Sequence, residues 1–425
     1  MPARPILITG ARTVDGFAQD LLIADGFFRE PADAPADVHR IDADGLLALP
    51  GLVDLHTHLR EPGREDAETV ESGTLAAARG GFTCVHAMAN TTPVTDTAEA
   101  VGRLAAIARV MAHCQVVPVG AVTKGLAGAQ LAQLEAMAGV GVTVFSDDGK
   151  CVADSGLMRR ALEIVGGFDG VIAQHSQDPL LAGPTACCHE SRYSAEFGLE
   201  GWPAQAESVI VARDAQLAEL TGARLHVCHV STAESVDVIR WAKRRGIRVT
   251  AEAMPHHLLL DTSLLQGRDT TFKVNPPLRT NEHLEAVREA LADGTIDAVA
   301  TDHAPHAAVD KAKPFELASP GMIGLEQALG VVIEVMVDTG RMDWPTLAER
   351  MSHTPARIGR VAGQGRPVAV GEPANLVLVD PARRARVDKN ASASRSRNNP
   401  YDGLDLPDPV VATFWQGTMT HTTLV

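Results

Sequence analysis

The chain has few aromatic residues and no long apolar run. Aromatics make up 4% of its 425 residues, so the core is expected to be mostly aliphatic. No continuous apolar stretch approaches the roughly 20 residues that a transmembrane helix needs. The first ten residues lack the basic, apolar and small-residue order of a secretory signal. Neither a membrane-bound nor an exported protein is expected.

Cysteine and positive charge are also scarce. The six cysteines show no Cys-x-x-Cys spacing, and in a long chain without an export signal this favours reduced thiols in a cytoplasmic protein. The 38 Lys and Arg are outnumbered by 53 Asp and Glu, which gives a formal charge of -15. That charge disfavours non-specific binding to nucleic acid or to an anionic membrane, but it does not disfavour a small anionic substrate.

What the chain does contain is an alternating middle between two strand-rich ends. Short strand-like segments with turns predict one small β-sandwich domain assembled from residues 1–50 and 365–425. The last ten residues, 416–425, are less regular, so the final strand of this sandwich is the least secure. Between the ends, apolar strand-like runs alternate with helical stretches; they lie at 51–60, 83–90, 115–123, 142–148, 170–176, 224–231, 248–255 and 297–304.

Eight strands alternating with helices predict an α/β fold, a closed TIM-like (β/α)8 barrel over residues 51–364. An open doubly wound sheet is the alternative, and it is disfavoured because no Gly-x-Gly-x-x-Gly fingerprint follows a first strand. If the barrel is right, the functional site lies at the C-terminal ends of its strands.

Metal-ligating side chains stand at the ends of several of these strands. His56 and His58 are two residues apart on one strand, so they project to the same side, and Arg60 falls on that side too. Further candidates follow later strands; they are Asp147, Asp148, His175, His229 and Asp302. A core built only for stability would not place so many ligands at equivalent strand ends.

Counting one aspartate of the 147–148 pair, six ligands suit two divalent ions rather than one, because a single catalytic zinc typically uses three protein ligands and a water. Histidine with carboxylate favours zinc first, with manganese or cobalt as substitutes. A two-metal site provides a nucleophile at neutral pH and polarises a carbonyl group. The pattern therefore favours hydrolysis of an amide-like bond, or its reversal.

Longer motifs surround these residues. They are VDLHTHLREPG at 53–63, AMANT at 87–91, FSDDG at 145–149, PHH at 255–257, VNPPLR at 274–279 and ATDHAPH at 300–306. Together they resemble dihydroorotases of the bacterial type, within the amidohydrolase superfamily. The resemblance runs from about residue 45 to 380 and implies a (β/α)8 barrel with a small β-sandwich, as the strand pattern does.

The resemblance also implies a ligand set for two Zn²⁺ per chain. His56, His58 and Asp302 hold one ion, His175 and His229 hold the other, and one aspartate of the 147–148 pair bridges both. Family spacing to His175 favours Asp148 as the bridge. Strand alternation alone leaves Asp147 and Asp148 open.

The implied reaction is the reversible cyclisation of N-carbamoyl-L-aspartate to L-dihydroorotate, the third step of pyrimidine synthesis. Asp302 is the implied catalytic residue, which carries the proton between the attacking water and the departing nitrogen. The implied substrate contacts are His58, Arg60, Asn90, Asn275, His306, Pro320 and Gly321. The long segment 306–321 is predicted to pack over the substrate and to exclude water.

Two other functions stay open. Another cyclic-amide hydrolase, such as a hydantoinase or allantoinase, shares the metals, but Arg60 with Asn90 favours a substrate that carries a carboxylate. A non-catalytic partner of aspartate transcarbamoylase would lack ligands, whereas all six positions here carry suitable residues. The sequence leaves a homodimer and a complex with that transcarbamoylase as open partner hypotheses; Phe27 and Phe28, at a turn, could cover the barrel or a second subunit.

Overall fold

Eight parallel strands form a closed barrel in the computed structural model, which describes residues 4–424. They are β6 (Leu52–Thr57), β7 (Phe82–Ala87), β8 (Gln115–Pro118), β9 (Val144–Phe145), β10 (Val171–Gln174), β13 (Arg224–Val227), β14 (Val249–Ala253) and β15 (Ala298–Val299). Neighbours along this order pair in parallel, and bridges between Gly120 and Phe145 and between Thr57 and His303 complete the ring. The predicted barrel is confirmed, and seven of its strands lie inside a predicted apolar run, while β7 begins one residue before its run, at Phe82.

Helices cover the outside of the barrel, and four of the longer ones begin at side-chain caps. The hydroxyl or carboxylate of Thr69, Thr97, Asp154 and Thr232 accepts from a backbone N–H in the first turn of the helix that follows it. The longer covering helices are α1 (Val70–Arg79), α2 (Ala98–Met111), α4 (Ser155–Gly167), α7 (Gln205–Thr221), α8 (Ala233–Arg244) and α10 (Asn281–Asp293). Their buried faces and the strands form a mainly aliphatic core, as the low aromatic content predicts.

Shorter helices occupy the loops and the last third of the barrel. They are α3 (Leu134–Gly139), α5 (Pro179–Ala182), α6 (Arg192–Phe197), α9 (Pro255–Leu259), α11 (Ala308–Lys311), α12 (Ala328–Val332), α13 (Trp344–Ala348) and α14 (Thr354–Gly359). Of these, α11 lies within the long 306–321 segment that follows β15. No helix in residues 4–424 is both long and apolar enough to cross a membrane.

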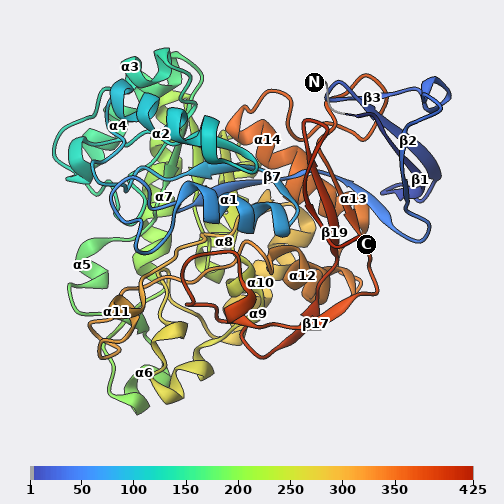
Figure 1. The fold of residues 1–425 in the computed structure, drawn as a ribbon. Helices are drawn as coiled ribbons and strands as arrows, with labels where there is room; N and C mark the ends of the chain where they lie inside the picture. The colour runs from blue at the N-terminus through green and yellow to red at the C-terminus, as the bar shows by residue number, and fades with distance from the viewer. Residues whose placement is uncertain (1–3, 425) are drawn as a thin grey trace.

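The two ends of the chain build one mixed sheet beside the barrel, where strands from both ends lie together in Figure 1. Its strands are β1 (Ile6–Thr13), β2 (Ala18–Ala24), β3 (Phe27–Arg29), β4 (His39–Asp42), β5 (Leu47–Pro50), β16 (Leu376–Val379), β19 (Val410–Trp415) and β20 (Thr418–Thr422). The join between the ends is the antiparallel pair of β5 and β16. Phe28 is buried in the core of this sheet, whereas Phe27 is 41% exposed.

The irregular end of the chain does contain a strand. β20 pairs antiparallel with β19, and the register shifts between Thr413 and Phe414. Such a bulge puts one extra residue on a strand and interrupts the alternation of its faces. That interruption, together with the exposure of the strand, explains why the sequence pattern is weak there.

Part of the C-terminal region leaves the sheet and packs on the barrel. Between β17 (Arg384–Arg386) and β18 (Asp405–Pro407), a loop reaches the ends of the barrel strands. Ser396 Oγ donates to the carbonyl of Ala67 (2.7 Å), and Asn398 Nδ2 donates to the carbonyls of Ala304 and Gly321 (3.0 Å each). A small parallel pair, β11 (Cys188–His189) with β12 (Gly201–Trp202), lies in the loop after β10.

Candidate metal centre

Four imidazoles and two carboxylates meet where the barrel strands end. They are His56, His58, Asp148, His175, His229 and Asp302, each at most 5% exposed. Their possible ligand atoms form two groups that share Asp148: one with His56, His58 and Asp302, the other with His175 and His229. Within each group all ligand atoms lie within 4.8 Å of one another. The structure thus brings together the six residues that the sequence analysis proposed as ligands.

The distances are those of side chains that face a common point. His58 Nε2 lies 3.0 Å from Asp302 Oδ1, and His229 Nε2 lies 3.3 Å from Asp148 Oδ1. His175 Nδ1 and His229 Nε2 face each other at 2.9 Å. His56 Nε2 is buried 3.2 Å from Asp148 Oδ1, yet it makes no hydrogen bond to any residue of 4–424.

A divalent cation satisfies such a cluster better than protons do. Neutral imidazole nitrogens and ionised carboxylate oxygens are suitable ligands for zinc and similar metals, and an unpaired buried nitrogen such as His56 Nε2 is otherwise costly. Burial acts to raise the pKa of Asp148, but the surrounding His56, His175 and His229 outweigh it and hold that pKa well below its usual range. The cluster is therefore able to hold a metal ion.

The structure distinguishes the two neighbouring aspartates. Asp148 is the one that faces the imidazoles. Asp147 turns the other way, and its Oδ1 accepts from the backbone N–H groups of Val122 and Thr123 at 2.8 Å each, while Thr123 Oγ1 donates to its Oδ2. Asp147 therefore ties the loop after β8 to the end of β9 and stands outside the cluster.

Three residues of the site have strained backbone. Arg60, His229 and Asp302 have φ values of +61°, +35° and +45°, a region that non-glycine residues rarely adopt. Each lies two or three residues after the end of a barrel strand, where the chain turns. Such strain often occurs at functional sites, where the surrounding structure compensates for it.

A second layer of side chains fixes the imidazole rings. Asn90 Oδ1 accepts from His58 Nδ1 at 2.9 Å, and Gln177 Oε1 accepts from His175 Nε2 at 2.9 Å. In both rings, the bond commits one nitrogen as a donor and leaves the other for the cluster. Asn90 does not cap the next helix, since α2 begins after Thr97.

Glu252, in the middle of β14, plays the same part for His56 and was missed by the sequence analysis. Its Oε1 accepts from His56 Nδ1 at 2.8 Å, and its Oε2 accepts from His226 Nε2 at 3.0 Å. It is 1% exposed, so it carries its charge only because both oxygens are bound. The one available signal was a lone carboxylate within the apolar strand run Val249–Ala253.

We expect Glu252→Gln to weaken metal binding by about 10- to 100-fold, the usual effect of removing a partner of a ligating histidine. Glutamine offers only one oxygen, so His56 and His226 can no longer both donate to it. Competition with a coloured chelator measures the change. Glu289→Gln, at an exposed position of α10, is the matched control. Equal chelator competition in the two variants would contradict this role.

A cavity of about 200 Å³ opens above the cluster. It is lined by all seven predicted substrate contacts, which are His58, Arg60, Asn90, Asn275, His306, Pro320 and Gly321. Gly321 has a φ of +150°, and a Cβ there would lie 2.6 Å from His306 Nε2, so the close packing of this wall requires glycine.

Arg60 and Asn275 offer groups of opposite kind to this cavity. Arg60 donates through Nε to the carbonyl of Pro305 at 3.0 Å, and its Nη nitrogens have no hydrogen bond to residues 4–424. Burial lowers the pKa of Arg60 to about 10, so it remains a cation at neutral pH. Asn275 Nδ2 donates to Gln177 Oε1 at 2.8 Å, which leaves the buried Asn275 Oδ1 without a partner among these residues.

His306 is engaged differently from Arg60. Its Nε2 donates to the carbonyl of Pro320 at 2.8 Å, and burial, with Arg60 next in effect, lowers its pKa to about 3. His306 is therefore a neutral side chain that holds one cavity wall to another. It can donate to a substrate carboxylate only by giving up the Pro320 carbonyl.

The paired histidines after β14 stand outside both ligand groups. His257 Nε2 donates to the carbonyl of Pro276 at 3.1 Å, so it supports the turn that carries Asn275. His256 is buried beside it, with ring centroids 4.4 Å apart. The positions of both histidines indicate a structural role rather than metal binding.

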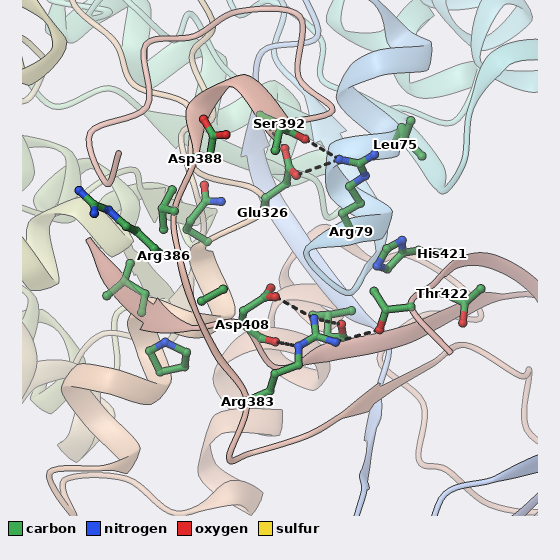
Figure 2. A pocket seen from close by; sticks show the side chains of 18 of the residues that line it. Leu75, Arg79, Glu326, Arg383, Arg386, Asp388, Ser392, Asp408, His421 and Thr422 are labelled. Carbon is green, nitrogen blue, oxygen red and sulfur yellow. Dashed lines mark hydrogen bonds and ion pairs between the residues drawn. The ribbon is translucent and has the colours of Figure 1, made fainter. Parts of the chain in front are cut away.

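A more spacious cavity, of about 650 Å³, lies between α1 and the C-terminal strands (Figure 2). Its arginines are largely engaged by the protein itself: Arg383 donates to Asp408 at 2.9 Å and to Thr423 Oγ1 at 2.8 Å, and Arg79 donates to the carbonyl of Ala391 at 2.9 Å. None of the six clustered ligands lines it. Convergent chemistry, rather than volume, therefore identifies the functional site.

Comparison with known proteins gives a consistent picture. A family model described as "Dihydro-orotase-like" matches residues 45–235. The chain is 56% identical over 419 residues to a protein named dihydroorotase from Streptomyces coelicolor, covering 97% of each chain. It is 49% identical over 421 residues to one of the same name from Mycobacterium tuberculosis, covering 98% of each.

Solved structures with the same fold come from related proteins. An L-hydantoinase (dihydropyrimidinase) from Arthrobacter aurescens superposes with a TM-score of 0.88 at 25% identity, covering 100% of this chain and 98% of the other. A D-hydantoinase (dihydropyrimidinase) from Thermus sp. superposes with a TM-score of 0.85 at 24% identity, covering 97% and 94%. These structural similarities show that the chain shares its fold with the two proteins.

Proposed function

The chain belongs to the dihydroorotase family, and from that membership we propose that it catalyses the reversible cyclisation of N-carbamoyl-L-aspartate to L-dihydroorotate and water. This is the ring-forming step of de novo pyrimidine (UMP) synthesis. In the opposite direction the enzyme is a hydrolase of a cyclic amide. The structural neighbours named hydantoinases share the fold at much lower identity than the dihydroorotases.

One observation supports dihydroorotate as the substrate. The cavity above the ligand cluster is lined by Arg60, whose guanidinium has unused donors, and by Asn275, whose buried amide oxygen has no partner among residues 4–424. Dihydroorotate carries one carboxylate and ring N–H groups, so it complements both. Hydantoin and allantoin have ring N–H groups but no carboxylate, and they would leave the Arg60 cation in this partly buried site unpaired.

The proposed roles of the protein's own residues follow from this fit. Arg60 binds the substrate carboxylate and Asn275 accepts a ring N–H, which together place the ring amide over the cluster. In hydrolysis, the oxygen of water bonds to the amide carbonyl carbon, Asp302 takes the water's proton, and the C–N bond breaks. Asp302 then gives that proton to the departing nitrogen, and cyclisation reverses each step.

We infer two Zn²⁺ ions per chain as the cofactor, one held by His56, His58 and Asp302 and one by His175 and His229, with Asp148 between them. The shared position of Asp148 in both ligand groups supports this count. When bound, such a pair of ions lowers the pKa of water and polarises the carbonyl group. The six free cysteines support the proposed cytoplasmic location, since reduced thiols are typical of that compartment.

A direct assay tests the proposal. The purified protein is expected to hydrolyse dihydroorotate, and Arg60→Met is expected to raise the KM for it by roughly 10- to 100-fold, because a hydrogen-bonded charge pair is lost. Arg64→Met is the matched control, since Arg64 is partly exposed and pairs with Asp66 on its own loop and with Asp310 on the segment after β15. Turnover of hydantoin or allantoin without turnover of dihydroorotate would reject the proposed substrate.

A further inference from the structure

One lysine joins two walls of the substrate cavity. Lys311 ends α11, in the long segment after β15, and its Nζ donates to three backbone carbonyls. The distances are 3.3 Å to Lys273, 3.0 Å to Ser319 and 3.1 Å to Gly321. No carboxylate among residues 4–424 forms an ion pair with it, so the three carbonyls are its only fixed partners in that part of the chain.

The three carbonyls belong to segments that reach the cavity. Ser319 and Gly321 line it directly, and Lys273 stands two residues before Asn275, which also lines it. The backbone N–H of Gly321 also donates to the Lys273 carbonyl, at 2.9 Å. The ammonium therefore sits at the junction of the Asn275 turn and the Ser319–Gly321 wall.

Burying an ammonium group costs free energy unless hydrogen bonds or opposite charges compensate for it. Burial, reinforced by the nearby Lys273, lowers the pKa of Lys311 to about 7, so the charged and neutral forms are both populated near neutral pH. Hydrogen bonds from a charged donor are roughly twice as strong as neutral ones. Three of them, converging from two segments, fix the spacing between those segments more tightly than the Gly321–Lys273 bond alone.

We propose that Lys311 is a positioning residue, which holds the Ser319–Gly321 wall and the Asn275 turn at the separation that the substrate ring requires. The proposal rests on the proposed function, because that function makes Asn275 and Gly321 the residues beside the ring. Lys311 touches neither the ligand cluster nor the cavity itself. It acts through the backbone that it ties.

Other hydrogen bonds anchor the segment after β15 close to the three bonds that Lys311 makes. Thr270 Oγ1 donates to the carbonyl of Lys311 at 2.6 Å, and Lys273 Nζ donates to the carbonyl of Glu316 at 2.9 Å. Asn398 supplies a second donor to the Gly321 carbonyl at 3.0 Å. Removal of the Lys311 amine should therefore loosen the cavity wall without detaching the whole loop.

The test replaces Lys311 with methionine, which keeps most of the side-chain volume and removes the donors. We expect the KM for dihydroorotate to rise about 10-fold, which corresponds to the free energy of one charge-assisted hydrogen bond. The change in kcat should be much smaller, and the metal content should not change. Hydrogen exchange should become faster in 273–275 and 319–321. Lys313→Met, on the same loop but exposed and paired with Asp310, is the control.

The outcomes distinguish the positioning role of Lys311 from the proposed function of the enzyme. A Lys311→Met enzyme with the KM and exchange rates of Lys313→Met would overturn the proposal. Faster exchange confined to the two segments, in a protein whose wild type does not turn over dihydroorotate, would support the tie and reject the proposed substrate. A KM that stays constant while kcat falls would also contradict a positioning role.

A second variant covers the case in which Lys311→Met does not fold. Lys311→Gln keeps a shorter neutral donor, and a smaller rise in KM is expected from it. Should neither fold, exchange in the wild type decides: the tie predicts that 273–275 and 319–321 open at the same rate and that dihydroorotate slows both. Independent opening of the two segments would overturn it.

Discussion

Asp302→Ala is expected to lower kcat for dihydroorotate by about 10³-fold or more. General acid–base groups contribute typically 10²- to 10⁴-fold, and Asp302 is proposed to serve also as a metal ligand, so its loss should fall at the upper end of that range. Its Oδ1 lies 3.0 Å from His58 Nε2 and 3.5 Å from His56 Nε2, and it lines the substrate cavity. Among residues 4–424, Asp148 is the only other carboxylate that lies beside both histidines and lines the cavity.

Turnover and metal content are measured together to separate the two roles of Asp302. Asp302→Asn keeps an oxygen ligand but is a far weaker proton acceptor, so it should retain more metal than Asp302→Ala and remain nearly inactive. Asp310→Asn, on the loop that follows β15, is the matched control and should stay close to wild type. An active Asp302→Ala enzyme would rule out the assigned role in proton transfer.

Asp148→Ala is expected to remove the metal held by His175 and His229, to weaken metal binding by the other ligand group, and to abolish activity. Asp148 is the residue that the two groups share, so its loss leaves His175 and His229 without a carboxylate and reduces the other group to His56, His58 and Asp302. Two imidazoles alone fall short of the three protein ligands of a typical catalytic zinc site. Metal analysis of the purified variant should show less than half of the wild-type content.

The neighbouring aspartate provides the matched comparison. Asp147→Ala should keep its metal but lose stability by about 1–3 kcal/mol, because the backbone N–H groups of Val122 and Thr123 lose their buried acceptor. Thermal unfolding measures the loss. Full metal content in Asp148→Ala combined with metal loss in Asp147→Ala would reverse the assignment of the two residues.

The barrel and its metal ligands could be predicted because both produce local patterns in the sequence. Each ligand follows an apolar run of strand length, and parallel strands in a barrel all end at one rim, so residues as distant as His56 and Asp302 must meet there. Strand alternation alone could not choose between Asp147 and Asp148; the family resemblance favoured Asp148, and the structure shows Asp148 facing the imidazoles. Both stand at the end of the same strand, and the direction of each side chain depends on a turn that alternation does not describe.

The supporting residues Glu252 and Lys311 could not be predicted from the sequence. The partner of Glu252 is distant along the chain, and the partners of Lys311 are backbone carbonyls, which do not depend on residue type. Glu252 binds His56 across 196 positions of sequence, and its own strand reads as ordinary buried β-structure apart from the single charge. Lys311 binds backbone carbonyls, which every residue offers, so no spacing or motif reveals it. Only the folded arrangement shows what either side chain holds in place.

The weak strand at the end of the chain illustrates a different limit. β20 pairs over only a few residues, and the bulge beside Phe414 shifts the register. A pattern based on strict alternation fails there, although the hydrogen-bonded pairing is intact. The loop at 394–398 departs from the predicted sandwich for a similar reason, because its serines and asparagine bind the barrel rim instead of a neighbouring strand.

Anomalous diffraction from crystals of the metal-loaded protein, recorded at the zinc absorption edge, tests the central claim most directly. The account predicts two strong peaks per chain, one within reach of His56, His58 and Asp302 and one within reach of His175 and His229, with Asp148 between them. A map without peaks among these six residues, or with peaks only elsewhere, would contradict it.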